Sequence, residues 1–151
     1  MVDDNFVFSL KNKLKKIKEK KKKIFICGNG GSACNAIHFA EDLMSLGFRA
    51  MHLCDIGFLT ATANDYAYEY VFSRPLKLWS DPGDLLITLS CSGTSENIWR
   101  VQKTAKDMNI DFIALPTNKE TNLSTPQTEN IHLEIIHKVY EYFKYISVLS
   151  K

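Results

Sequence analysis

The chain has 151 residues, of which 45% are hydrophobic and 24% charged, a composition typical of one folded domain with a sizeable core. No apolar run approaches the roughly 20 residues that span a membrane, and the N-terminus lacks the apolar core of a secretion signal, so both classes are excluded. The formal net charge of +2 hides an uneven distribution, because nine lysines and one glutamate lie between Lys11 and Lys23.

This lysine-rich segment overlaps the first predicted helix, residues 3–20. Apolar residues recur in it at three- and four-residue spacing, namely Phe6, Leu10, Leu14 and Ile17. We therefore expect residues 1–20 of a single domain, 1–151, to form a basic N-terminal helix that docks by one side on the domain or on another subunit. No arginine or aromatic residue interleaves with the lysines, which favours a solvated helix face over a nucleic-acid or membrane contact.

Beyond this helix, short apolar runs alternate with segments of helical periodicity. Strands are predicted at residues 24–27, 49–54, 85–89 and 111–115, and helices at 32–46, 68–79, 96–108 and 131–149. Residues 58–63 are predicted to be a short helical or irregular piece. The polar segment 116–129 is predicted to be a loop. This alternation predicts an α/β fold with a parallel sheet and helices on both faces, in which ligands lie beyond the carboxyl ends of the strands.

Four cysteines, Cys27, Cys34, Cys54 and Cys91, show no CxxC pair and no zinc-finger spacing. Two of them fall in apolar strand-like runs, where a free thiol behaves as a small hydrophobic group. We expect reduced thiols and a cytoplasmic protein.

Two small-residue turns directly follow apolar strands. The first, 28–32, is rich in glycine and begins a helix, which is an arrangement that favours anions. The second, 90–95, offers four hydroxyls and the N–H groups of a helix start, and neutral donors of this kind suit a phosphate monoester. An ordinary capped helix would need one hydroxyl, so we favour phosphate binding. Neither turn fits GxxxxGK[ST] or GxGxxG, so ATP and dinucleotides are not expected.

Histidines mark two of the predicted helices. His38 and Asp42 are four residues apart and share a helix face. His132 and His137 are five apart, about 140° around the last helix, so at most one of them is expected to face a site. Imidazoles and a carboxylate would serve either a metal ion or acid–base chemistry on a carbonyl.

Four motifs in this order and spacing resemble the phosphoheptose isomerases of the sugar isomerase (SIS) superfamily. They are GNGGSACNAIHFAEDL, NDYAYEYVFSR, SCSGTSEN and IHLEIIH. The resemblance runs from about Lys23 to the C-terminus. It implies a flavodoxin-like three-layer sandwich that self-associates as a dimer or tetramer, with active sites between subunits. It also implies conversion of sedoheptulose 7-phosphate to D-glycero-D-manno-heptose 7-phosphate through an enediol.

Carried over position by position, the resemblance assigns roles to residues of this sequence. Substrate binding is implied for Asn29, Gly30, Ser32, Asn64, Asp65, Ser90, Cys91, Ser92 and Ser95. Proton transfer falls on Asp42, at the position of the family's glutamate, and on His137. Zinc ligation, one ion per site, falls on His38, Asp42, Glu129 and His137.

Two geometric expectations accompany this assignment. Glu41 is expected to lie a full helical step away from the face that carries His38. Glu129 and His137 are eight residues apart, about 12 Å along an unbroken helix, so we expect both to reach one ion only if the helix begins after Glu129.

A second hypothesis from a different class is a non-catalytic module that binds a sugar phosphate or another protein. His38 and His137 favour the enzyme, whereas aspartate in place of the family's glutamate favours the module. We favour the enzyme. Nucleic-acid binding through the lysine-rich segment rests on charge alone and ranks last.

Overall fold

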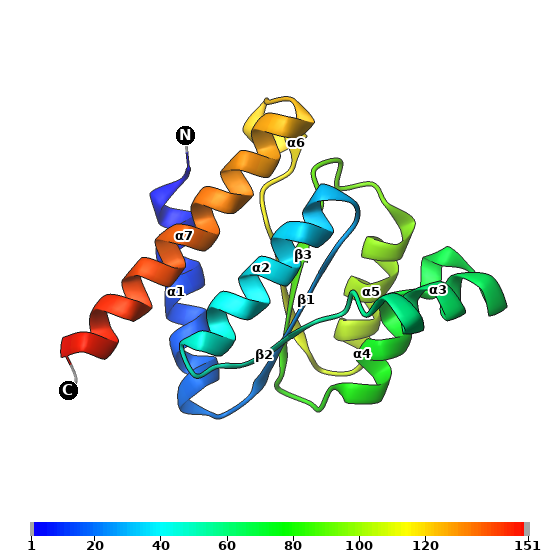
Figure 1. Ribbon diagram of the computed structural model, residues 1–151, viewed down its shortest axis with the longest axis horizontal. Coiled ribbons are helices and arrows are strands. Elements are labelled where there is room, and N and C mark those ends of the chain that lie inside the picture. Colours follow the sequence, from blue (N-terminus) through cyan, green and yellow to red (C-terminus); the bar gives the residue numbers. More distant parts are fainter. Residues whose placement is uncertain (1, 150–151) are drawn as a thin grey trace.

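A parallel β-sheet lies between two layers of helices in the computed structural model, which describes residues 2–149 (Figure 1). Within those residues the sheet has four strands in the order β2-β1-β3-β4. The central pair is β1, Lys23–Gly28, and β3, Leu85–Leu89, and the edge strands are β2, Arg49–His52, and β4, Asp111–Ala114. All three pairings are parallel. The predicted α/β fold is confirmed.

The two central strands are buried on both faces, which explains their continuous apolar sequences. Because successive side chains of a strand point to opposite faces, Ile24 and Ile26 pack into one core while Phe25 packs into the other.

Helices on the first face carry the residues on which the site depends. This layer contains α1, Asp4–Glu19, α2, Gly31–Ser45, and α7, Thr125–Leu149. The opposite layer contains α3, Ile56–Asp65, α4, Ser73–Trp79, and α5, Glu96–Asp107. A 3₁₀ turn, Tyr68–Tyr70, and the short helix α6, Asn118–Thr121, lie in connections. Figure 1 shows α2 and α7 running side by side in the same direction.

The lysine-rich helix α1 docks on its own domain. Its buried residues are Val7, Leu10, Leu14 and Ile17, close to the predicted stripe. Several of its lysines tie it to other elements: Lys13 pairs with Asp111, and Lys18 donates to the Leu46 carbonyl at 2.7 Å. Part of the positive charge therefore serves to fix α1 in place.

The segment after β4 corrects the predicted loop 116–129. It contains α6, and α7 begins at Thr125 rather than at residue 131. Ser124 acts as the N-cap, because Gln127 Oε1 accepts from both the Ser124 N–H, at 3.1 Å, and its hydroxyl, at 2.8 Å. The Ser-x-x-Gln sequence is a capping pattern that marks this start. The start was not predicted because the first turn of α7 is polar and lacks apolar periodicity. α3, Ile56–Asp65, likewise extends beyond both ends of the predicted segment 58–63.

None of the helices in residues 2–149 is both long enough and apolar enough to span a membrane.

Candidate active site

A polar pocket lies where the two small-residue turns meet. β1 and β3 are neighbours, with Gly28 opposite Leu89, so the turns that follow them emerge side by side at the carboxyl edge of the sheet. The cavity between them measures about 190 Å³. We call it the polar pocket, and its lining residues are Asn29, Ser32, Ser90, Cys91, Ser92, Ser95, Thr125 and Glu129.

The structure thus brings six of the nine predicted substrate-binding residues into one cavity. Gly30 does not line it, but its φ of 56° lies in the left-handed region and lets the chain turn into α2. Gly28 is constrained by a close contact, because a Cβ there would lie 2.8 Å from the Leu89 carbonyl oxygen. This close approach of the two turns therefore requires glycine at position 28.

The 90–95 turn presents neutral hydrogen-bonding groups to this pocket. The Gly93 N–H donates to Ser90 Oγ at 3.1 Å, and the Thr94 N–H donates to Ser92 Oγ at 3.2 Å. Ser95 is the N-cap of α5, yet within the described chain its hydroxyl makes no capping hydrogen bond. Burial raises the pKa of the Cys91 thiol, which keeps it uncharged. The polar side chains that the turn presents to the pocket are therefore uncharged.

A pair of amides that sequence reasoning missed braces the two turns. Asn29 and Asn97 each donate from Nδ2 to the other's Oδ1, both at 2.9 Å, and the Tyr68 hydroxyl donates to Asn29 Oδ1 at 3.0 Å. Asn97 is buried in the first turn of α5. Its position directly after the 90–95 turn was visible in the sequence, but its partner, 68 residues away, was not.

The side chain of Glu129, a residue of α7, lies beside Gly31 at the start of α2. Its carboxylate occupies the space where a side chain on Gly31 would lie, so a larger residue at position 31 would displace it. A carboxylate is favourable beside the positive end of a helix dipole. The position at the first turn that favours an anion is thus occupied by the chain's own carboxylate.

A second constellation, which we call the histidine–aspartate cluster, consists of His38, Asp42 and His137. His38 Nε2 lies 3.3 Å from Asp42 Oδ2, and the rings of His38 and His137 meet edge to face with centroids 5.4 Å apart. Asp42 is 9% exposed. Burial raises the pKa of its carboxyl above the ordinary value, and the neighbouring His38 opposes that rise. A carboxylate with a raised pKa is a better proton acceptor than an ordinary one.

Glu41 corrects one expectation. Ligand atoms of His38, Glu41 and Asp42 all lie within 4.8 Å of one another, so Glu41 belongs to the same surface as His38. The physical reason is helical geometry, since residues three apart are neighbours just as residues four apart are.

Two observations support a metal ion at the histidine–aspartate cluster. Asp42 Oδ2 is buried and has no hydrogen-bond partner among residues 2–149, which leaves it free to act as a ligand. Imidazole nitrogens and carboxylate oxygens are also donors that zinc accepts. Within the described residues the group of close ligand atoms consists of His38, Glu41 and Asp42, and both Glu129 and His137 lie outside it. Because α7 is unbroken from Thr125, Glu129 is separated from His137 by about 12 Å of helix. Its ligation remains a prediction from resemblance.

Asn64 and Asp65 do not reach the polar pocket within this chain. They lie at the end of α3, where Asn64 Nδ2 donates to Asp65 Oδ1 at 3.0 Å, and both belong to the exposed surface. Their predicted contact with the sugar stays a prediction.

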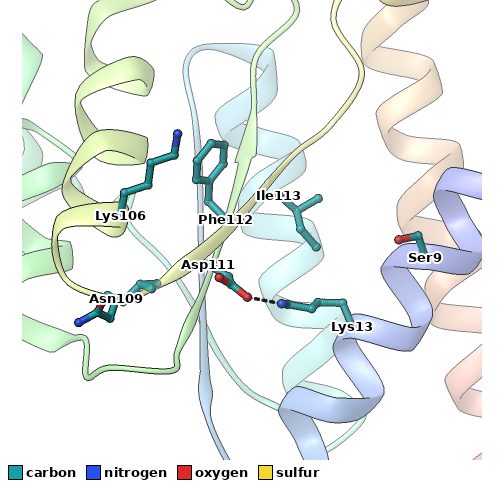
Figure 2. Close-up of a pocket in the computed structure, with 8 residues that line it drawn as sticks. Ser9, Lys13, Lys106, Asn109, Asp111, Phe112 and Ile113 are labelled. Carbon is teal, nitrogen blue, oxygen red and sulfur yellow. Dashed lines mark hydrogen bonds and ion pairs between the residues drawn. The ribbon is translucent and has the colours of Figure 1, made fainter.

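A larger cavity of about 610 Å³ lies at the other end of the sheet (Figure 2). It borders the beginning of β4, where Lys13 reaches Asp111 and the Lys106 ammonium lies 5.3 Å from the centre of the Phe112 ring. None of the predicted site residues lines it. Since ligands of parallel sheets bind at the carboxyl ends of the strands, volume alone is a poor guide to the site here.

Comparison with known proteins relates this arrangement to one family. The SIS domain family matches residues 10–117. The chain is 35% identical over 136 aligned residues to the phosphoheptose isomerase of Cytophaga hutchinsonii, covering 76% of this chain and 71% of the relative. It is 33% identical over 144 residues to that of Mycobacterium tuberculosis, covering 82% and 73%.

A solved structure is also similar. The phosphoheptose isomerase of Neisseria gonorrhoeae superposes with a TM-score of 0.87 at 28% identity, covering 94% of this chain and 86% of that one.

Proposed function

The chain belongs to the phosphoheptose isomerase family of SIS domain proteins, and we propose that it is an aldose–ketose isomerase acting on a seven-carbon sugar phosphate. Sedoheptulose 7-phosphate is the proposed substrate, and D-glycero-D-manno-heptose 7-phosphate is the proposed product. The single domain would comprise residues 1–151, of which 2–149 are described.

One observation carries the proposal: α2 and α7 each contribute both to the polar pocket and to the histidine–aspartate cluster. On α2 the pocket residue Ser32 precedes His38 by six positions, about 9 Å along the axis. On α7 the pocket residue Glu129 precedes His137 by eight positions, about 12 Å. A substrate that carries phosphate at one end and a carbonyl at the other suits this separation, and a seven-carbon chain suits it better than a triose.

The proposed chemistry moves one proton between C1 and C2. One of the pair Asp42 and His137 accepts a proton from C1 while the other supplies a proton to the C2 oxygen, which gives the enediol. Return of a proton to C2 and loss of the O1 proton then give the aldehyde, so atoms and charge balance. The raised pKa of Asp42 supports its part as proton acceptor.

Zinc is the proposed metal, with His38, Asp42 and His137 as its ligands. The ligand atoms of His38 and Asp42 lie close together with that of Glu41, and His137 is included because its ring meets that of His38. When bound, such an ion would polarise the substrate carbonyl as a Lewis acid. His38 has no proton-transfer role in this proposal, so its substitution separates metal binding from acid–base chemistry.

We also propose that the protein works as a dimer or tetramer. The exposed position of Asn64 and Asp65 supports this, since residues at the end of α3 would reach a sugar only in the site of a neighbouring subunit. Mixing Asp65→Asn with His137→Asn chains tests it: hetero-oligomers should recover turnover that neither variant has alone. A monomeric mass by light scattering during turnover would refute it.

The four free thiols support a cytoplasmic location.

The central experiment incubates the protein with sedoheptulose 7-phosphate, with added zinc or with a chelator, and identifies the product by nuclear magnetic resonance. We expect isomerisation, and deuterium incorporation at C2 in heavy water. Unphosphorylated sedoheptulose and a triose phosphate are the matched controls, and both should react poorly. If neither metal condition gives turnover while the substrate still raises the melting temperature, the isomerase proposal is wrong and a binding module replaces it.

Asp42→Glu tests whether side-chain length limits the rate. The variant restores the longer carboxylate of the family at this position, and turnover should rise because a better-placed base increases the rate. Unchanged or lower turnover would mean that the site is built around aspartate.

A further inference from the structure

His132 is the buried histidine that the proposed proton transfer leaves unused. It lies on α7, is fully buried, and places Nε2 at 2.7 Å from the Pro116 carbonyl oxygen. A carbonyl oxygen has no proton to give, so the ring must donate from Nε2. Burial lowers the pKa of the imidazole and so favours its neutral form. Nδ1 has no hydrogen-bond partner in residues 2–149, so the bond to Pro116 is the polar contact that orients the ring.

Pro116 begins a short segment, residues 116–118, that packs against the 90–95 turn. Just before it, the Leu115 N–H donates to the Thr88 carbonyl at 2.9 Å, which keeps the chain beside β3. Just after it, the Asn118 N–H donates to the Cys91 carbonyl at 2.7 Å. A Cβ on Gly93 would lie 2.8 Å from Thr117 Cγ2, so the segment and the turn are in direct contact.

Two hydrogen bonds of 2.7 Å, from His132 to Pro116 and from Asn118 to Cys91, therefore connect α7 to the backbone near the start of this turn. Pro116 has no N–H, so its carbonyl is its only backbone hydrogen-bonding group, and His132 binds that group. Five residues further along the same helix, about 7.5 Å on, is His137.

We propose that His132 is a positioning residue, which holds the phosphate-binding turn at a fixed place relative to His137 by way of residues 116–118. The inference rests on the proposed function, because it assigns phosphate to the 90–95 turn and proton transfer to His137. In this arrangement α7 sets the distance between the two ends of the substrate: His132 fixes the turn that holds the phosphate, and His137 meets the reacting carbons.

Substitution of His132 should weaken phosphate binding more than it slows the chemical step. Without the donor, the Pro116 carbonyl loses its partner. Residues 116–118 are then held to α7 by the exposed hydrogen bond from Asn118 Nδ2 to Thr125 Oγ1, 3.0 Å, at the first residue of that helix. The turn can then shift, and its N–H and hydroxyl groups no longer converge on the phosphate. His137 keeps its own contact with His38, so the histidine–aspartate cluster should be preserved.

Steady-state kinetics of three variants test this proposal. His132→Leu removes the donor, His132→Gln offers an amide N–H near the position of Nε2, and Ile135→Ala is the matched control, a fully buried residue of α7 in the hydrophobic core. We expect His132→Leu to raise KM for sedoheptulose 7-phosphate about tenfold with kcat changed less than twofold, and His132→Gln to recover most of that loss. Ile135→Ala should lower the melting temperature without changing KM.

Either of two results would overturn the proposal: an unchanged KM in His132→Leu, or an equal rise of KM in Ile135→Ala, which would mean that lost stability alone is responsible. All assays run at a temperature where circular dichroism shows every variant folded.

Calorimetry with inorganic phosphate separates this inference from the proposed function. If wild-type protein gives no turnover but His132→Leu weakens phosphate binding and His132→Gln restores it, the isomerase proposal fails and the positioning role stands. If turnover is normal and His132→Leu changes neither KM nor phosphate affinity, the positioning role fails alone.

Discussion

The polar pocket and the histidine–aspartate cluster are built on different principles. The pocket consists mostly of two turns whose polar residues come together because β1 and β3 are adjacent strands. The cluster consists of three side chains: His38 and Asp42 are neighbours on α2, and His137 of α7 meets them because the two helices pack side by side. The first depends on backbone shape and the second on side-chain identity, so the two regions should respond differently to substitution.

The largest effect is expected in the cluster. His137→Asn should lower kcat for sedoheptulose 7-phosphate about 10³-fold with little change of KM, because it removes a proton-transfer group but no group of the polar pocket. His52→Asn is the control, since His52 lies on β2, away from the cluster. A rise of KM at constant kcat would assign His137 to binding and would erase the contrast between the two regions.

Ser95→Ala should show the opposite pattern. The Ser95 hydroxyl lines the polar pocket and makes no cap bond, so we expect its loss to raise KM about 10- to 100-fold while kcat changes little, as for a hydrogen bond to a charged group. Ser147→Ala, near the far end of α7, is the matched control. If kcat falls instead, the 90–95 turn acts on the reacting carbons and not on the phosphate.

Glu129→Gln tests the one carboxylate that lines the polar pocket. A carboxylate close to a phosphate is unfavourable, so the neutral amide should lower KM about tenfold. Glu134→Gln, an exposed glutamate of the same helix, should leave KM unchanged. A higher KM for Glu129→Gln would mean that the carboxylate binds the sugar or a metal ion, and the zinc content of the variant would decide between these two roles.

The smallest effect concerns stability at the cluster. The folded chain raises the pKa of Asp42, so between its ordinary and its raised value the folded state holds a proton that the unfolded state has lost. Stability should therefore fall as pH rises through this window. In chelated protein, Asp42→Asn should raise the melting temperature by about 2–4 °C at pH 7, and this gain should vanish below the ordinary pKa of aspartate.

Asp107→Asn, at an exposed ion pair on α5, should show no such pH-dependent gain. Loss of stability in Asp42→Asn at neutral pH would mean that His38 fully compensates the buried charge of Asp42.

The sequence alone predicted the parallel α/β fold and most of the polar pocket. Both are local features: apolar runs, glycines and capping residues act within a few positions, and the strand–turn–helix order places both turns at one edge of the sheet. The start of α7 was missed because its first turn is polar, although Ser124 and Gln127 carried the capping signal. The position of Glu41 was misjudged from helical geometry that the sequence already contained.

Tertiary structure alone decided which distant groups meet. It placed Glu129 against Gly31, joined Asn29 to Asn97, and turned His132 toward Pro116 while His137 met His38. These pairs are 16 to 99 residues apart along the chain, and their contacts depend on how helices pack across the sheet. Local periodicity restricts which face of a helix a residue occupies, but only packing determines what that face touches.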